Sequence, residues 1–341
     1  MIVRARAPLR LGLAGGGTDV APYCDLHGGY VMNAAIDKYA HATIEAGDAL
    51  VELHALDGGT QASCAPAALD AMPGPLQLLA GVYLRISRDF LGGERPPLRI
   101  RTWSDAPPGS GLGSSSTLVV ALVAAFAEYF ALGLGEYEVA HLAYEVERQD
   151  LALAGGKQDQ YAAAFGGFNF MEFHAGDRVI VNPLRIKDWV LAELEASLLL
   201  YFTGVSRESA RIIDEQSRNA ERGAADALDA MHALKREAVQ MKEALLRGDL
   251  RAFAATLQQG WEAKKRMASS ISNPMIDALE ATARAHGATA TKVSGAGGGG
   301  FMMFACDPVD RIRLARALQG EGGRLLDFHF NPAGAVAWRV P

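Results

Sequence analysis

Residues 107–117 read Pro107-Pro108-Gly109-Ser110-Gly111-Leu112-Gly113-Ser114-Ser115-Ser116-Thr117. Glycines at every second position expose successive backbone N–H groups, because no Cβ blocks an approaching anion. The apolar run that follows, up to Leu134, is typical of a buried helix, and Ser and Thr hydroxyls suit a helix start because they satisfy unpaired N–H groups. Unpaired N–H donors and the helix dipole both attract an anion at such a junction. The stretch therefore predicts a phosphate-binding loop.

Two common nucleotide-binding patterns do not fit this loop. A Walker loop ends in Gly-Lys-Ser/Thr, whereas Gly113 is followed by serines and no lysine. The dinucleotide fingerprint needs an acidic residue at a set distance after a short strand, and that residue is missing. A flexible Gly/Ser linker is the other interpretation, but linkers rarely run straight into a long apolar segment.

The composition is that of an ordinary globular protein with room for two domains. The chain has 341 residues, of which 50% are hydrophobic and 21% are charged, and this length is long for a single core. A formal net charge of −6 argues against a nucleic-acid surface. Apolar runs are too short or too interrupted to span a bilayer, and the N-terminus lacks the apolar stretch of a signal peptide.

The three cysteines are Cys24, Cys64 and Cys306. Their odd number and wide spacing fit buried thiols in a reducing compartment and offer no zinc-ligand spacing. These features predict a cytoplasmic enzyme that acts on small molecules.

The segment from Pro107 to Ser115 resembles the ATP-binding motif Pro-x-Gly-x-Gly-Leu-Gly-Ser-Ser of the GHMP small-molecule kinases, the family of galactokinase, homoserine kinase and mevalonate kinase. The match has no gap, and two further segments resemble the other motifs of the family. The resemblance implies that ATP is bound by Pro108, Gly109, Ser110, Gly111, Leu112, Gly113, Ser114, Ser115 and Ser116.

The first family motif corresponds to residues 7–19, where an alternating strand pattern runs into three glycines and Thr18-Asp19. The resemblance implies a catalytic role for Arg10 and a substrate-binding role for Gly16, Gly17, Thr18 and Asp19. Galactokinases have Glu-His where Gly16 and Gly17 stand, so this site has space and bare N–H groups for a larger sugar or a phosphate. The alternatives are a solvated strand face for Arg10 and a helix cap for Asp19.

A second predicted helix spans residues 136–153 and carries Glu147 on a face with small residues. Glu147 stands twelve residues before Asp159, which matches the spacing of the family pattern. The resemblance implies a Mg²⁺ site formed by Ser115 and Glu147, and Mg²⁺ needs few protein ligands because it keeps waters and nucleotide oxygens. The alternative is a surface glutamate paired with Arg148 or Arg211.

Residues 155–161 read Gly155-Gly156-Lys157-Gln158-Asp159-Gln160-Tyr161. The glycine pair predicts the end of one helix and the start of another near residue 158. The resemblance to sugar kinases of the family implies that Asp159 is catalytic, whereas an ordinary first-turn aspartate would only favour the helix dipole. Lys157 is expected either to hold a substrate phosphate or to lie in solvent.

A buried strand is predicted over Leu198–Phe202, and Ser206 and Arg207 follow it near a helix start. A phosphate on the substrate would need a local cation, because burying it without partners is costly. We expect Arg207 to supply that cation, with Lys157 as the next candidate.

The third family motif corresponds to Lys292–Phe301, between two predicted strands. The resemblance implies that its loop packs beside the phosphate loop and that Gly295 and Gly297 border the substrate cleft. The alternative is a structural glycine corner. Leu325–Phe330 and Ala335–Val340 are predicted to supply the remaining strands of the C-terminal sheet.

The resemblance implies an α+β fold with the two domains of GHMP kinases. Residues 1–190 would form a nucleotide-binding domain that resembles domain 2 of ribosomal protein S5. Residues 191–341 would form a ferredoxin-like domain, with the active site between the two.

Within the family the sequence is most similar to a bacterial group of kinases that phosphorylate the anomeric hydroxyl of D-glycero-D-manno-heptose 7-phosphate for surface polysaccharides. The alternatives are a fucose- or galactose-type anomeric kinase and a sugar-sensing regulator without turnover. The implied partners are ATP, Mg²⁺ and a small sugar phosphate. No nucleic acid or membrane is expected, and a homodimer is left open.

Overall fold

A computed structural model of the chain describes residues 1–72, 74–204, 212, 215 and 225–341. The strands are β1 (Ile2–Ala14), β2 (Gly29–Ala46), β3 (Val51–Ala55), β4 (Thr60–Cys64), β5 (Leu98–Ser104), β6 (Phe168–Phe173), β7 (Val179–Pro183), β8 (Leu198–Phe202), β9 (Ala288–Val293), β10 (Phe301–Cys306), β11 (Arg324–Leu326) and β12 (Val336–Val340). The α-helices are α1 (Tyr23–His27), α2 (Gln77–Phe90), α3 (Ser114–Phe130), α4 (Glu136–Glu145), α5 (Gln158–Phe165), α6 (Asp188–Ser197), α8 (Ala225–Arg247), α9 (Leu250–Lys265), α10 (Pro274–Ala285) and α11 (Arg311–Gln319). Short helical turns are η1 (Pro66–Ala71), η2 (Gly74–Leu76), η3 (Val146–Asp150) and η4 (Pro308–Asp310).

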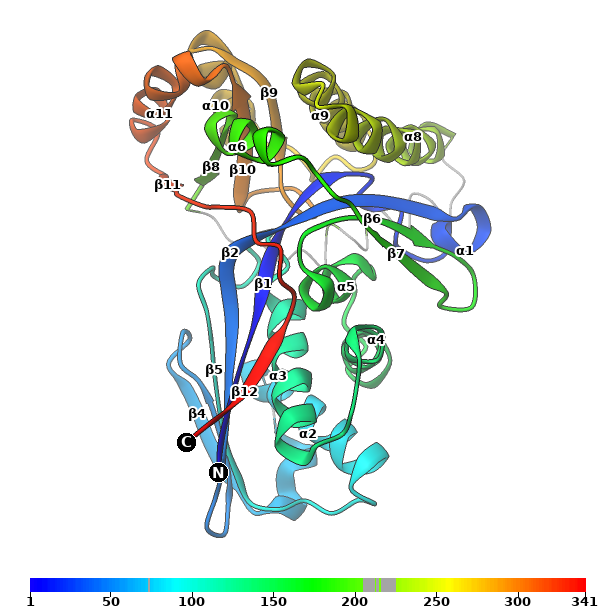
Figure 1. Ribbon diagram of the computed structural model, residues 1–341, viewed down its shortest axis with the longest axis vertical. Coiled ribbons are helices and arrows are strands. Elements are labelled where there is room, and N and C mark those ends of the chain that lie inside the picture. The colour runs from blue at the N-terminus through cyan, green and yellow to red at the C-terminus, as the bar shows by residue number, and fades with distance from the viewer. Residues whose placement is uncertain (73, 205–211, 213–214, 216–224) are drawn as a thin grey trace.

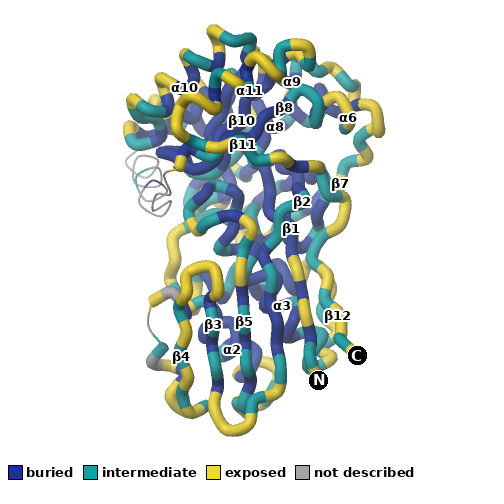
Figure 2. The backbone as a smooth tube through the Cα atoms, turned by 90° about the vertical axis from the view of Figure 1, so that its left-hand side faces the viewer, coloured by how far each residue is buried: buried dark blue, intermediate teal, exposed yellow. Residues whose placement is uncertain are grey.

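The larger sheet has eight strands among the described residues, in the order β12-β1-β2-β5-β3-β4, and β6 and β7 continue from β2. β2 is one long strand of 18 residues. Its first half pairs with β6 and its second half with β5. Helices α2 to α5 lie on one side of this sheet (Figure 1). The apolar helix α3 is buried along most of its length, as Figure 2 shows.

A register shift in β1 determines the direction in which Arg10 points. The pairing of β1 with β2 slips between Pro8 and Arg10, where Pro8 also lacks an N–H for the ladder. Val3, Ala5 and Ala7, before the shift, belong to the core beneath α3. The leucines that follow it, at positions 9, 11 and 13, belong to a different core, which also holds residues of α8 and α9. The shift therefore turns Arg10 toward α5, whose Asp159 it contacts.

The smaller sheet is antiparallel, in the order β11-β8-β10-β9. Strand alternation divides its side chains between two cores. Leu200 and Met303 pack in the core shared with β1 and β2, whereas Tyr201 and Phe304 pack in a core shared with α10 and α11. The smaller sheet is thus joined to the larger one through apolar packing, which holds the β9–β10 loop in place.

The chain ends in the larger sheet. β12 pairs antiparallel with β1, from Ile2 opposite Val340 to Arg6 opposite Val336, and the two termini lie together (Figure 1). The prediction that Ala335–Val340 completes the C-terminal sheet is therefore wrong, and only β11 adds to that sheet. Among the described helices, none combines the length and apolar character that a membrane span requires.

Candidate active site

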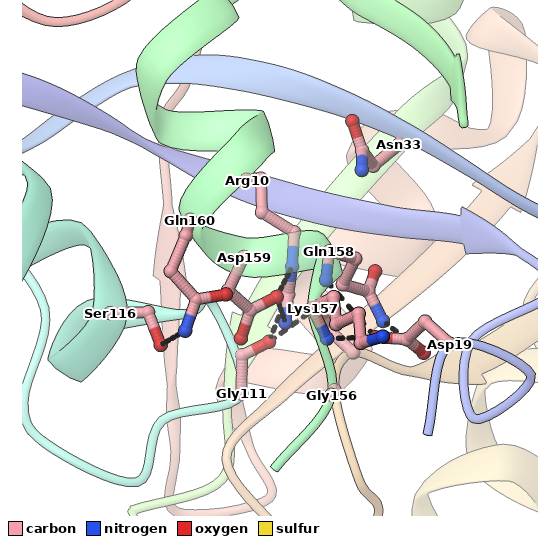
Figure 3. Close-up of polar contacts among 12 residues, drawn as sticks. Arg10, Asp19, Asn33, Gly111, Ser116, Gly156, Lys157, Gln158, Asp159 and Gln160 are labelled. Atoms are coloured by element: carbon pink, nitrogen blue, oxygen red, sulfur yellow. Dashed lines mark hydrogen bonds and ion pairs between the residues drawn. The ribbon is translucent and has the colours of Figure 1, made fainter. Parts of the chain in front are cut away.

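A cavity of about 510 Å³ lies where four segments meet: the phosphate loop, the glycine loop after β1, the start of α5 and the β9–β10 loop. From the first half of the chain, the lining contains Arg10, Glu147, Arg148 and parts of segments 17–20, 108–116 and 153–159. From the second half, it contains Lys264, Gly295 and Ala296. Figure 3 shows the polar contacts at this junction.

Helix α3 begins at the phosphate loop without a side-chain cap. Its N-cap residue is Gly113, with a left-handed φ of 77°. The serine hydroxyls bond elsewhere: Ser114 Oγ donates to the carbonyl of Pro107 (3.2 Å), Ser115 Oγ to Glu147 (3.3 Å), and Ser116 Oγ accepts from Gln160 (3.2 Å). The expectation that Ser or Thr hydroxyls cap this helix is therefore wrong. The N–H groups of the first turn remain available to an anion in the cavity.

The phosphate loop packs directly on the β9–β10 loop. Ser294 Oγ donates to the carbonyl of Gly111 at 2.9 Å, and the N–H of Phe301 donates to the carbonyl of Ser110 at 2.8 Å. A Cβ on Gly111 would lie 2.3 Å from the Ser294 carbonyl oxygen, and one on Gly295 would lie 2.7 Å from Gly111 Cα. Both positions therefore require glycine. This contact confirms the expected packing of the third motif beside the phosphate loop.

Arg10 and Asp159 form the polar centre of the site (Figure 3). Arg10 is 3% exposed, and its Nε and Nη2 lie 2.8 and 2.7 Å from Asp159 Oδ1. Its Nη1 donates to the carbonyl of Gly111 at 2.6 Å. A Cβ on Gly113 would come within 3.3 Å of Asp159 Oδ2, so the glycine lets the carboxylate approach the phosphate loop. The solvated strand face considered for Arg10 is excluded by this burial.

Ser115 and Glu147 face each other across the cavity wall. Glu147 is 1% exposed, and its Oε1 accepts from Ser115 Oγ while Oε2 accepts from Gln160 Nε2. Its position depends on the π-helical turn η3, because α4 ends at Glu145 rather than continuing to Leu153 as expected. Such π-helical turns are frequent at functional sites. The surface position considered for Glu147 is excluded, since the side chain is buried, but Arg148 Nη1 does lie 3.8 Å from Glu147 Oε1. Arg211, the other partner considered, lies outside the described residues.

Ser115 and Glu147 fit a Mg²⁺ ion. Among the described residues, no group of three or more His, Cys, Asp or Glu side chains could hold a metal ion. A hydroxyl and a carboxylate beside a phosphate loop meet the small protein contribution that Mg²⁺ needs, because nucleotide oxygens and waters complete its shell.

Asp19 holds the start of α5. Its Oδ2 accepts from the backbone N–H groups of Lys157 (2.9 Å) and Gln158 (3.1 Å), and its Oδ1 accepts from Gly17 N–H (3.1 Å) (Figure 3). A Cβ on Gly156 would lie 1.9 Å from Asp19 Oδ2, so this approach needs glycine. The capping role weighed for Asp19 is present, and the residue also borders the cavity.

Lys157 and Arg207 are the two residues predicted to bind a phosphate of the substrate. Lys157 is buried, but its Nζ lies 2.6 Å from Asp177 Oδ1 and does not border the cavity. Burial lowers the pKa of Lys157, but the hydrogen bond to Asp177 and the electrostatic effects of Cys24, Tyr144 and Asp177 together raise it overall. This placement contradicts the predicted contact with a substrate phosphate. Arg207, the preferred candidate, lies outside the described residues.

Several other predicted residues do not line the cavity themselves. Thr18 Oγ1 donates to the carbonyls of Gly15 and Tyr30 and closes the glycine loop. Gly297 packs on Ile271 and does not reach the cavity. In the phosphate loop, Ser110 and Leu112 are fully buried and contribute backbone rather than side chain.

Sequence reasoning missed two cationic side chains that line the cavity. Lys264 comes from α9 and is 4% exposed, and its Nζ donates to the carbonyl of Gly295. Arg148 donates to the carbonyls of Leu153 and Gly156 and holds the segment before α5 in place. Lys264 had a detectable signal, because it follows Leu257 and Trp261 at helical spacing on the buried face of α9.

One cavity holds a Gly-rich anion loop, a hydroxyl–carboxylate pair and a carboxylate bound by an arginine. This combination defines the site of an enzyme that transfers a phosphoryl group to a small molecule. The GHMP kinases N terminal domain model matches residues 77–167, and the GHMP kinases C terminal model matches residues 241–324. The chain belongs to the GHMP kinase family, with its two-domain mixed α/β fold.

Relatives span the whole chain. A D-glycero-alpha-D-manno-heptose 7-phosphate kinase of Campylobacter jejuni is 47% identical and covers 99% of each chain. The crystal structure of a D-glycero-D-manno-heptose 1-phosphate kinase from Bacteroides thetaiotaomicron is 44% identical, with a TM-score of 0.84 over 99% of each chain. A Lactococcus lactis galactokinase structure, 16% identical, has a TM-score of 0.78 over 98% of this chain and 95% of that chain, and shows the shared fold alone.

Proposed function

We propose that this protein transfers the γ-phosphoryl group of MgATP to the anomeric hydroxyl of D-glycero-D-manno-heptose 7-phosphate and forms the 1,7-bisphosphate. The observation that carries the proposal is the Arg10–Asp159 pair beside the phosphate loop. The 47% identical heptose 7-phosphate kinase supports the choice of sugar. A sugar already phosphorylated at C1 has no free anomeric hydroxyl, so we choose the 7-phosphate over the 1-phosphate named for the other relative.

Asp159 would receive the proton of the attacking hydroxyl. Both Arg10 contacts go to Oδ1, so Oδ2 is the oxygen that can accept that proton. Arg10 keeps the carboxylate oriented and places positive charge where the attacking oxygen becomes negative. In such reactions the protein contributes mainly positioning and neutralisation of charge, because the transferring group does the covalent chemistry.

The nucleotide phosphates would lie on the N–H groups of the phosphate loop and the first turn of α3. Ser115 and Glu147 would hold Mg²⁺, which neutralises charge on the β- and γ-phosphates when it is bound. We assign nucleotide binding to residues 1–190 and closure of the cleft to residues 191–341, with β12 as the exception. Action in the cytoplasm fits the three free cysteines.

The test is a substrate panel read by ADP release and by the position of the new phosphate in ³¹P NMR spectra. The panel contains heptose 7-phosphate, heptose 1-phosphate, free heptose, L-fucose and D-galactose. We expect the highest kcat/KM with heptose 7-phosphate and a new phosphate on C1. Faster turnover of fucose or galactose would contradict the proposal, and so would ATP binding without turnover of any sugar. Light scattering of the same protein tests whether it forms a homodimer, which the sequence leaves open.

A further inference from the structure

Lys264 is a buried cation in the lining of the cavity. It is carried by α9, and its side chain is 4% exposed. Its Nζ donates to the carbonyl of Gly295 and would lie 3.8 Å from a Cβ placed on Gly16. In the described part of the chain, no carboxylate lies within ion-pair distance of this ammonium group. Burying a cation without a carboxylate is costly, so this position calls for an anion from outside the protein.

The other cationic side chains of the cavity are already engaged. Arg10 is bound to Asp159 and Gly111. Arg148 is bound to carbonyls of the segment before α5 and lies beside Glu147, at the metal end of the cavity. Of the three cationic side chains that line the cavity in the described part of the chain, Lys264 is therefore the one that can bind a second anion.

The glycine loop adds donors at the same place. The N–H of Gly15 donates to Glu237 at 3.4 Å and that of Gly17 to Asp19 at 3.1 Å. The N–H of Gly16, between them, has no such bond among the described residues. Because Gly16 lacks a Cβ, the Gln158 amide nitrogen and the Lys264 ammonium both lie within 4 Å of the point where that Cβ would stand. Gln158 Nε2 donates one hydrogen to Asp19 Oδ1 at 3.3 Å and keeps the other. That second hydrogen, the lysine and the bare N–H surround one space and form a phosphate-binding arrangement.

We propose that Lys264, with Gly16 N–H and Gln158 Nε2, binds the phosphate that the sugar substrate already carries. This proposal rests on the proposed function, because it requires a sugar phosphate as substrate. In this proposal the substrate phosphate contacts none of the residues assigned to Mg²⁺ and to the nucleotide phosphates.

The proposal predicts a pH signature. The charged groups that face Lys264 are Lys292 on β9, Arg10 on β1, Asp19 after β1 and Glu237 on α8. Burial has the largest effect and, with the positive charges of Lys292 and Arg10, lowers the pKa of Lys264 to about 7. The negative charges of Asp19 and Glu237 act in the opposite direction. Lys264 is therefore charged below pH 7 in the free enzyme, and a bound phosphate raises its pKa. KM for the sugar phosphate should be lowest between about pH 6 and 7 and rise about tenfold per pH unit above pH 7. It should rise again below about pH 6, where protonation removes the second charge of the substrate phosphate.

The test compares Lys264→Met, Lys264→Arg and the matched control Lys265→Met, with heptose 7-phosphate and free heptose as substrates. Lys265 is the next residue on α9 and pairs with Glu262 and Glu280 outside the cavity. We expect Lys264→Met to raise KM for heptose 7-phosphate about 10- to 100-fold. KM for ATP and the rate with free heptose should change little. Lys264→Arg should keep affinity and lose the rise in KM above pH 7, and Lys265→Met should match the wild type.

Two results would overturn the proposal. Equal losses on phosphorylated and free heptose would place Lys264 at the transferring group, and an unchanged KM in a folded Lys264→Met would remove it from recognition altogether. Thermal unfolding and circular dichroism check that each variant folds. Calorimetric binding of heptose 7-phosphate without ATP separates this proposal from the proposed function: weaker binding by Lys264→Met supports the phosphate site even if the wild-type enzyme shows no turnover, which would contradict the function alone.

Discussion

Asp159 is the residue on which the assigned chemistry depends most directly. Its Oδ1 is held by Arg10 and its Oδ2 faces the cavity side of Gly113. Asp159→Asn keeps the shape of the side chain but removes the proton acceptor, so we expect kcat to fall by roughly 10²–10⁴. ATP binding should persist, because the phosphate loop is untouched. Steady-state kinetics and nucleotide fluorescence titration measure the two quantities, and turnover near that of the wild type would disprove the assignment.

Ser115 and Glu147 should act together through Mg²⁺. Ser115→Ala removes an oxygen ligand and Glu147→Gln removes the negative charge of the other ligand, so we expect each variant to need more Mg²⁺ for its half-maximal rate. Magnesium titrations at fixed, saturating ATP measure this requirement. If both curves overlay that of the wild type, the metal is held elsewhere. The matched control is Ser114→Ala, whose hydroxyl bonds to the carbonyl of Pro107 and does not face Glu147.

For single residues, the sequence was informative where a motif determines both the residue type and the direction in which its side chain points. Arg10 and Asp159 were predicted from two separate motifs, and the structure brings them together. Lys157 was predicted from proximity in sequence alone, and it faces Asp177 because residues two apart near a helix start point about 200° apart. Lys264 lies outside every motif, so only its phase on an apolar helix face could have revealed it.

Among the secondary-structure elements, α5 depends on a glycine just before it. Asp19 reaches the first N–H groups of α5 only because Gly156 has no Cβ, which would lie 1.9 Å from Asp19 Oδ2. Gly156→Ala should displace that carboxylate, cost about 1–3 kcal/mol of unfolding free energy, and lower kcat because α5 carries Asp159. Thermal unfolding and kinetics measure both effects.

Gly12→Ala provides the control for this substitution. Gly12 lies on β1, and a Cβ there would meet nothing within 4 Å. We expect unfolding temperature and kcat near those of the wild type. A Gly156→Ala variant as stable and active as Gly12→Ala would show that Asp19 does not hold α5.

Element boundaries were predictable where local chemistry sets them. The start of α5 at Gln158 follows from the glycine pair before it, and the structure has this start as expected. The end of α4 was not predictable, because the apolar pattern continues beyond Glu145 while the backbone changes to the π-helical turn η3. That change depends on buried contacts of Glu147 with Ser115 and Gln160, which are distant in sequence.

For the whole molecule, the two sheets are tied together by the end of the chain. The segment from Asn331 to Ala335 packs on α5, since the N–H of Gly167 donates to the carbonyl of Asn331 at 2.9 Å and a Cβ on Gly334 would lie 1.9 Å from the Ala164 carbonyl oxygen. β12 then covers the edge of β1. Sequence patterns identified this strand but not its partner, because alternation in one strand does not specify which sheet it joins.

Removal of residues 335–341 tests this tie. The deletion takes away β12 and leaves β1 as an open edge strand, so we expect the unfolding temperature to fall by at least about 5 °C and the protein to aggregate more readily. At low temperature, the folded fraction should keep its KM for ATP, because the last β12 pair, Arg6 with Val336, lies four residues before Arg10. The control is removal of Pro341 alone, which is exposed and follows the last paired residue. An unfolding temperature equal to that control would show that β12 adds no stability, and a loss of kcat in the folded fraction would show that the strand helps to position Arg10.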